Sequence, residues 1–323
     1  MRKGKIVLIT VPADQGDILP DFLDWHLDLG VDLILAMDHG SKDDSREVLD
    51  QYSRTRPVKW FSLPERDLRK YSAPDDLAAL ARDHYDAEWI INCDVDEFLC
   101  TGGADLRGIL KEAERQGVTL LNVPRRSVTG PPLQPGQRAT RALTLRIDRA
   151  VEPTHEQQLS WNLPVPFVFL DVGGHLVVRA SALAEYGLGA HFATTTWGES
   201  VISDKLYILH YAVRGFESLR EKVDNTAAFL DLNNQLAPCE CWHWRRWIQL
   251  NEEGRLRNDY DQQFVSPERA QELIREGVCV VDDTVADWVS KKESLWGARR
   301  GLSDVAQWFS RSGMFPLRRL STR

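Results

Sequence analysis

The first hundred residues alternate between short apolar runs and segments with helical periodicity. Runs rich in large or β-branched apolar residues predict buried strands. The predicted strands cover residues 5–11, 33–37, 58–61 and 89–99. Apolar residues recur every three or four positions between them, which predicts helices over residues 18–30, 45–52 and 77–85. Gly30 is expected to end the first helix and Asp17 to cap its start.

This alternation of strand and helix continues from residue 5 to residue 99 and is typical of a mostly parallel sheet. The sequence therefore predicts an α/β fold with helices on both faces of the sheet. In open sheets of this kind, ligands bind at the carboxyl ends of the strands. Asp14, Asp38 and Asp94 all fall at such ends.

The chain after residue 100 is less regular. A helix over 106–113 continues the pattern, and a second helix is expected to begin at Glu217. Further strands are predicted over residues 118–123, 167–170, 175–178 and 207–211. Two segments without periodicity, residues 127–138 and 154–166, predict long surface loops.

The pattern changes again at residue 225, where segments dense in Trp, Arg and Glu begin. We therefore predict a sheet domain over residues 1–224. A helical C-terminal extension over residues 225–323 would pack on that domain. No internal repeat marks a further boundary.

In the stretch WIINCDVDEFL, residues 89–99, an apolar run typical of a buried strand is followed by three acidic residues. As one continuous strand, it would direct Asp94 and Asp96 to the same side and Val95 to the core. Two such carboxylates repel each other unless a cation lies between them, and carboxylate oxygens suit Mg²⁺ or Mn²⁺. An ion of this kind usually needs a phosphate to complete its shell. The alternative is a polar strand end that faces solvent.

Charge and cysteine content narrow the class of protein. The formal net charge of -8 argues against nucleic-acid binding, which needs clustered positive charge. Five scattered cysteines fit reduced thiols better than a disulfide framework. The sequence shows no secretory pattern and no apolar run of about 18 residues. We expect a cytoplasmic protein, or one peripheral to the inner face of the membrane.

Two stretches carry a resemblance to a known family. Residues 17–49, DILPDFLDWHLDLGVDLILAMDHGSKDDSREVL, are followed about forty residues later by EWIINCDVDEFL. Together they resemble the nucleotide-binding half of family 2-like glycosyltransferases with the GT-A fold, in the bacterial branch with an Asp-x-Asp-Glu-Phe motif. The resemblance covers about residues 5–100 and returns at Leu209-His210-Tyr211. The family's usual Asn-Glu after the first strand is Asp14-Gln15 here, which leaves open the side chain that meets the nucleobase.

The resemblance implies a site for a nucleotide diphosphate sugar and a divalent cation, Mn²⁺ or Mg²⁺. Asp38 would lie near the base or ribose, Asp94 near the ribose or the metal, and Asp96 on the metal. A late histidine would complete the metal shell, and Glu97 would support the ligands from behind. Arg214 and Lys222 would neutralise the diphosphate leaving group. The expected metal set is Asp94, Asp96 and His210, and the expected nucleotide-sugar set is Val11, Asp14, Asp38, Asp94, Arg214 and Lys222.

Enzymes of this family are mostly inverting and need a general base beside the acceptor. His191 and Glu199 follow the strand after Gly173-Gly174, where the resemblance places such a base, and Asp171 is a third candidate. The paired glycines would either border the acceptor site or form a plain hairpin.

The resemblance thus implies a metal-dependent glycosyltransferase that moves a sugar, with a UDP-sugar favoured, to a glycan or lipid-linked acceptor. Synthesis of a surface polysaccharide or another glycan is the expected setting. An Asp-x-Asp phosphohydrolase is one alternative class, because phosphatases also place this motif at a strand end. A non-catalytic nucleotide-sugar-binding protein is the other.

Two C-terminal features add expectations of their own. Trp242, Trp244 and Trp247 are expected to pack the extension on the sheet domain, with a sugar-stacking platform as the alternative. Residues 299–323 hold six arginines and one acid among apolar residues. This composition suits an interfacial segment that contacts an anionic membrane, and a helix packed on the body is the alternative.

Overall fold

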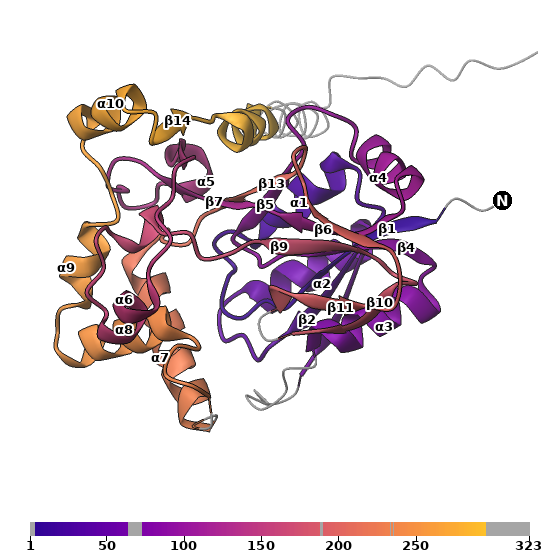
Figure 1. Cartoon of the computed structure of the whole chain (residues 1–323), viewed down its shortest axis with the longest axis horizontal. Coiled ribbons are helices and arrows are strands. Elements are labelled where there is room, and N and C mark those ends of the chain that lie inside the picture. The colour runs from indigo at the N-terminus through magenta and orange to yellow at the C-terminus, as the bar shows by residue number, and fades with distance from the viewer. Residues whose placement is uncertain (1–3, 64–72, 188–189, 233, 235, 295–323) are drawn as a thin grey trace, which may run out of the picture.

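A computed structural model of the chain describes residues 4–63, 73–187, 190–232, 234 and 236–294 (Figure 1). The strands are β1 (Lys5–Thr10), β2 (Leu33–Asp38), β3 (Val58–Ser62), β4 (Ala87–Asn92), β5 (Glu97–Cys100), β6 (Val118–Val123), β7 (Arg125–Thr129), β8 (Leu145–Ile147), β9 (His175–Arg179), β10 (Leu183–Tyr186), β11 (Ala193–Thr195), β12 (Glu199–Ile202), β13 (Tyr207–His210) and β14 (Cys279–Val281). The helices are α1 (Leu19–Leu29), α2 (Ser45–Thr55), α3 (Ala73–His84), α4 (Leu106–Arg115), α5 (Ala139–Ala142), α6 (His155–Ser160), η1 (Phe167–Phe169), α7 (Phe216–Leu232), α8 (Trp242–Glu252), α9 (Leu256–Asp261) and α10 (Pro267–Arg275). Residues 284–294 are also helical.

The central sheet has seven strands in the order β12-β6-β9-β4-β1-β2-β3. Four of its six strand pairs are parallel. The two antiparallel pairs are both made by β9. The prediction of a mostly parallel sheet is therefore confirmed, with β1 and its neighbours at its centre.

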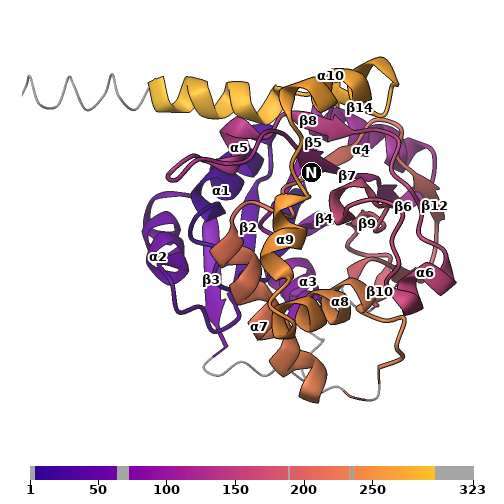
Figure 2. The same cartoon turned by 90° about the vertical axis from the view of Figure 1, so that its left-hand side faces the viewer.

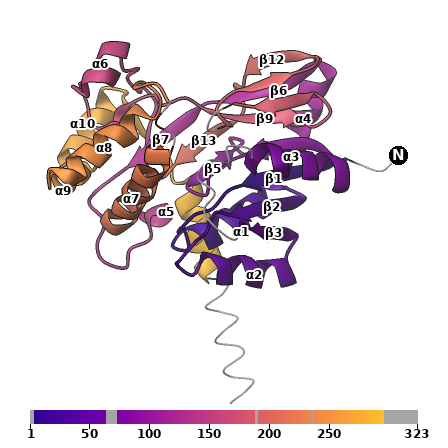
Figure 3. The same cartoon turned by 90° about the horizontal axis from the view of Figure 1, so that it is seen from below.

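Helices cover both faces of this sheet, also as predicted (Figure 3). Successive side chains of β1 point to opposite faces, so Ile6 and Leu8 pack in one core while Val7 and Ile9 pack in the other. The first core contains apolar residues of α1 and α2, and the second contains those of α3. Gly30 ends α1 with φ of 109°, a left-handed conformation that favours glycine.

A second sheet has five strands in the order β14-β8-β7-β13-β5. It joins β14, at residues 279–281, to strands from the middle of the chain. β13 pairs with β5, and β14 closes the far edge against β8. The predicted boundary between residues 224 and 225 falls inside α7. Residues after 225 are mostly helical but also contribute β14. Figures 1 and 2 show α7, α8 and α9 grouped with α6 on one side of the molecule.

Several local predictions were wrong. The acidic stretch is not one strand: β4 ends at Asn92, the chain turns over residues 93–96, and β5 joins the second sheet. The predicted strand over residues 167–170 is instead the short helix η1 over 167–169 followed by an isolated bridge at Leu170, because an apolar run alone does not separate helix from strand. Asp17 does not cap α1, whose N-cap residue is Ile18 without a side-chain cap. Asp17 is instead an ion-pair partner of Arg214.

The two predicted loops are also partly ordered into regular elements. The segment 154–166 contains α6, which begins with a capping box formed by Thr154 and Gln157. The segment 127–138 gives its first three residues to β7. Residues 299–323, the predicted interfacial segment, lie outside the described residues. Among the described residues, no helix is both long and apolar enough to cross a membrane.

A buried polar cluster around Asp259 fixes α8 and α9 to the rest of the fold. Trp247 Nε1 donates to Asp259 Oδ2 at 2.8 Å, and Arg246 donates to both carboxylate oxygens. Gln263 Nε2 donates to the Asp259 carbonyl oxygen at 2.9 Å, and its Oε1 accepts from Val168 N. The cluster therefore links α8, α9 and η1.

We expect Asp259→Ala to lower the free energy of unfolding by about 3 kcal/mol, because it leaves the Arg246 charge and a buried indole N–H without their acceptor. Asp261→Ala is the matched control, since Asp261 pairs with Arg257 on the exposed surface of α9 and should cost less than about 0.5 kcal/mol. Urea unfolding followed by tryptophan fluorescence would measure both. Equal losses in the two variants would contradict the structural role of Asp259.

Candidate functional site

A cleft of about 780 Å³ lies at the carboxyl ends of the parallel strands. One wall comes from the segments after β1, β2 and β4, and includes Val11, His39, Asp94 and Asp96. The opposite wall comes from α7, α8 and the segments around α6 and η1. The cleft therefore lies where a mostly parallel sheet is expected to bind its ligand.

The loops after β1 and β2 are fastened to each other. Asp14 N donates to Ser41 Oγ at 3.0 Å, and the Asp14 carboxylate accepts from Lys42 N. Asp38 is fully buried and accepts from Ser41 N and from Arg46 Nε, the latter at 2.7 Å. Asp14 and Asp38 thus hold the loops that carry Val11, Ala13 and His39 to the cleft, and neither is among the lining residues.

The acidic turn between β4 and β5 brings Asp94 and Asp96 to the cleft in different environments. The Asp94 side chain is 60% exposed. Its pKa is raised to about 6 by desolvation within the cleft and by the nearby charge of Glu97. The turn is closed by Glu97 N, which donates to the Asp94 carbonyl oxygen, and by Tyr211 N, which donates to that of Asp96.

Asp96 is buried and holds two cations. Lys222 Nζ and Arg214 Nη1 contact its Oδ2 at 2.5 and 3.2 Å. Burial alone would raise the pKa of Asp96, but Lys222, His210 and Arg214 outweigh it and hold that pKa below its ordinary value. Arg214 is itself buried and bound to Asp17, so it lies behind Asp96, whereas Lys222 lines the cleft.

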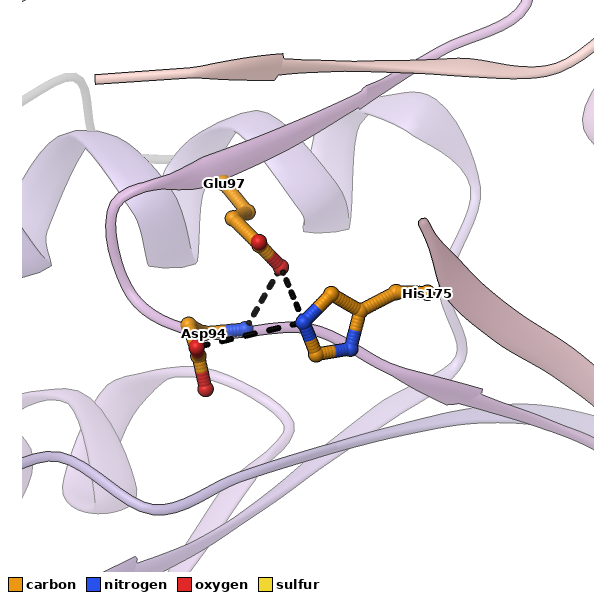
Figure 4. A group of neighbouring side chains, drawn as sticks. All are labelled: Asp94, Glu97 and His175. Atoms are coloured by element: carbon orange, nitrogen blue, oxygen red, sulfur yellow. Dashed lines mark hydrogen bonds and ion pairs between the residues drawn. The ribbon is translucent and has the colours of Figure 1, made fainter. Parts of the chain in front are cut away.

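Glu97 is the centre of a buried network (Figure 4). Its Oε1 accepts from Arg125 Nη1 at 2.9 Å, and its Oε2 faces His175 Nε2 at 3.2 Å and accepts from Asp94 N at 3.1 Å. Burial would raise the pKa of Glu97, but His175 and Arg125 hold it well below its usual range. Arg125 also donates to the carbonyl oxygens of Val172 and Gly173 at 2.7 and 3.1 Å. The network therefore joins the acidic turn to the 171–174 loop.

Two sets of side chains could be considered for a divalent cation. The ligand atoms of Asp94, Glu97 and His175 lie within 4.8 Å of one another (Figure 4). His175 Nε2 has no hydrogen-bond partner among the described residues, but it lies 3.2 Å from Glu97 Oε2 in a buried ion pair, in which a protonated Nε2 leaves no lone pair for a metal. The ligand atoms of the predicted set, Asp94, Asp96 and His210, do not all lie within 4.8 Å of one another. These three residues nevertheless line one cleft.

Features of the predicted set fit a metal. His210 Nδ1 is buried and has no hydrogen-bond partner among the described residues. The pKa of His210 is lowered to about 3 by burial and by Arg125, which keeps its imidazole neutral. Both cations on Asp96 contact Oδ2, and no described residue bonds to Oδ1. A neutral imidazole and carboxylate oxygens are a ligand set that Mn²⁺ accepts.

The three candidate bases are placed differently. Asp171 and His191 line the cleft, whereas Glu199 is exposed on the edge strand β12 and does not. Asp171 Oδ1 accepts from Gly173 N at 3.0 Å, which orders the loop. His191 Nδ1 lies 3.1 Å from the Gly174 carbonyl oxygen, and desolvation together with His175 and Arg125 lowers its pKa to about 4.

Sequence reasoning missed Arg125 and His175, which have no motif of their own. Their positions at the starts of β7 and β9 become meaningful only when the strands are assembled. It also did not predict that aromatic side chains make up much of the opposite wall of the cleft. The spacing of Trp242, Trp244 and Trp247 was a signal in the sequence.

No family model matches the chain, and no curated protein matches it. Among solved structures, it is similar to S. aureus TarS 1–349 in complex with UDP-GlcNAc, with 12% identity, a TM-score of 0.42 and 83% of each chain covered. The chain spans 39% of the longer S. aureus TarS chain, at a TM-score of 0.40 and 12% identity. Glucosyl-3-phosphoglycerate synthase from Mycobacterium tuberculosis, in complex with Mn²⁺, UDP and phosphoglyceric acid, gives 17% identity and a TM-score of 0.33, with 56% of this chain and 57% of that chain covered. At this level of similarity, the activity of the chain has to be argued from its own residues.

We expect Glu97→Gln to lower the pKa of His175, because the carboxylate charge that now raises it is removed. A pH titration of the imidazole signals by NMR would measure this change. Glu88→Gln is the control, since Glu88 pairs with Arg179 away from the cleft. An unchanged His175 titration in the Glu97 variant would contradict the network of Figure 4.

Proposed function

We propose that this protein is a metal-dependent glycosyltransferase that moves a sugar from a nucleotide diphosphate sugar to an acceptor hydroxyl. The observation that carries the proposal is the single cleft that holds Asp94, Asp96, His210 and Lys222 at the carboxyl ends of β1, β2 and β4. Acidic ligands, a neutral imidazole and a cationic side chain are the groups that a diphosphate and its divalent cation require.

The nucleotide would lie along the loops after β1 and β2. Val11, Ala13 and Gln15 line this part of the cleft together with His39. Asp14 and Asp38 hold these loops through backbone N–H groups, so we assign them an indirect role in nucleotide binding. A UDP-sugar is the donor that the resemblance of residues 5–100 favours.

Asp94, Asp96 and His210 would hold Mn²⁺ or Mg²⁺. When bound, such an ion supplies positive charge against the negative charge that develops on the departing diphosphate. Lys222 contributes a second charge from the cleft wall, and its flexible stem allows its ammonium to leave Asp96 for a phosphate oxygen. Arg214 then remains on Asp17 and Asp96 and keeps the acidic turn in place.

The acceptor hydroxyl must lose a proton as it attacks the anomeric carbon. We assign this proton to Asp171, which lies on the loop that Arg125 joins directly to the acidic turn. This connection fixes the base relative to the donor. His191, on the same side of the cleft, is the second candidate. In an inverting reaction the base would act on the face of the sugar opposite the leaving group.

The first test concerns the metal. We expect Asp96→Asn and His210→Gln each to lower Mn²⁺-dependent UDP release from UDP-sugars by more than about 100-fold, because even residues behind metal ligands are worth 10- to 100-fold. A coupled assay of UDP release over a panel of UDP-sugars would also name the donor. Asp204→Asn is the control, since this exposed acid lies outside the cleft. Thermal melting should establish that each variant is folded. Full activity of both site variants would exclude this metal set.

The second test concerns the base. We expect Asp171→Asn to lower kcat by about 10²- to 10⁴-fold, the usual contribution of a general base, while Mn²⁺-dependent UDP affinity is unchanged. Glu199→Gln should behave as the unaltered protein, because its side chain is outside the cleft. A large loss of kcat in His191→Asn with little change in Asp171→Asn would transfer the role to His191.

A further inference from the structure

The wall of the cleft opposite the acidic turn is built from aromatic rings. Phe167 of η1 stacks on His243 with ring centroids 5.4 Å apart and lies 4.6 Å from Trp247. Trp244 lies 5.2 Å from Trp247 and 5.3 Å from His243. These rings form one continuous surface of α8 and η1, which we call the aromatic wall: Phe167, Trp242, His243, Trp244 and Trp247.

The tryptophans of the aromatic wall are not equivalent. Trp247 is almost fully buried and donates its indole N–H to Asp259, so it serves the core. Trp242 is buried as well. Trp244 is only half-buried, lines the cleft, and its indole N–H bonds to none of the residues that the structure describes. A large ring with an unused donor at a cleft surface can still contact a ligand.

The charged groups near this wall are unfavourable for an anion. Six charged side chains line the cleft: Asp94, Asp96, Arg125, Glu152, Asp171 and Lys222. Arg125 is paired with Glu97, and Lys222 is paired with Asp96 and, under the proposed function, is taken up by the donor diphosphate. Glu152 and Asp171 are exposed acids on the side of the aromatic wall. An acceptor that carries a phosphate there would meet like charge without a free cation to offset it.

We propose that the aromatic wall is the acceptor subsite and that it takes a neutral pyranose ring, stacked on Trp244. This inference rests on the proposed function and names the class of acceptor. The apolar C–H face of a sugar ring covers an indole well, while the sugar hydroxyls need hydrogen-bond acceptors around the ring.

Polar groups that line the same cleft as Trp244 suit those hydroxyls. Gln158 of α6 and Glu152 of the segment before α6 both line the cleft, as does Asp171 of the 171–174 loop. Gln158 Nε2 donates to the Pro153 carbonyl oxygen at 3.3 Å, which leaves its own carbonyl oxygen to accept a sugar hydroxyl. Helix α6 packs on α8, so these groups keep a fixed relation to the wall. A ring stacked on Trp244 thus shares the cleft with carboxylate and amide oxygens that can accept its hydroxyl groups.

The test measures binding of matched neutral and anionic sugars to the full chain with Mn²⁺ and UDP. The probes are the methyl glycosides of glucose, galactose, mannose and N-acetylglucosamine and the 6-phosphate of each, observed by saturation-transfer NMR. We expect at least one neutral glycoside to bind and its 6-phosphate to bind at least about tenfold more weakly. Trp244→Ala should weaken the neutral glycoside by about two- to tenfold, the range for one lost ring contact.

Trp197→Ala is the matched control, because Trp197 is an exposed tryptophan outside the cleft. This variant should bind the glycoside as the unaltered chain does. Trp244→Phe should recover part of the loss, and thermal melting of both Trp244 variants should show that they are folded. Tighter binding of the phosphorylated probes, no binding of any neutral glycoside, or equal effects of the two alanine variants would overturn the subsite. Mn²⁺-dependent UDP binding is measured in the same samples, and its absence would instead count against the proposed function.

Discussion

The buried ion pair between Glu97 and Arg125 is the constraint on which the rest of the cleft depends. Both side chains are almost inaccessible, at 0% and 8% exposed, so neither charge can be left without its partner. Arg125 uses its other N–H groups on the carbonyl oxygens of Val172 and Gly173. The acidic turn and the 171–174 loop, about eighty residues apart in sequence, are thereby held at a fixed separation. A donor site and a base need that kind of mutual placement.

The charged side chains around Asp96 suit the charged ligand that the proposed function requires. Lys222 and Arg214 both contact one oxygen of Asp96, and their charges keep that carboxyl ionised. Of the two cations on Asp96, Lys222 lines the cleft and Arg214 does not, because Arg214 is also bound to Asp17. Under the proposed function, an incoming diphosphate would compete with Asp96 for Lys222, while Arg214 stays on Asp17 and Asp96. The acidic turn would then keep its position.

The sequence was sufficient for six of the seven strands of the central sheet, all but β12, because their apolar pattern is local. The continuous apolar run of β1 and the helical spacing in α1 and α3 are readable from neighbouring residues, as is the end of α1 at Gly30. The break between Asn92 and Glu97 was not readable, since β5 leaves the run of β4 only to pair with β13, more than a hundred residues later. Arg125 and His175 escaped prediction for the same reason. Their roles arise from strands that meet in space, and no local pattern carries that information.

The two walls of the cleft follow from two different ways of burying side chains. On the sheet side, short loops held by backbone hydrogen bonds present small and polar groups such as Ala13 and Gln15 to the cleft. On the helical side, α8 must bury Trp242 and Trp247, and the helical spacing that does so leaves Trp244 at the surface between them. Helix α8 thus buries two of its tryptophans and leaves the third half-buried in the lining of the cleft. This is why a residue that looks like part of a packing stripe in the sequence can serve recognition in the folded chain.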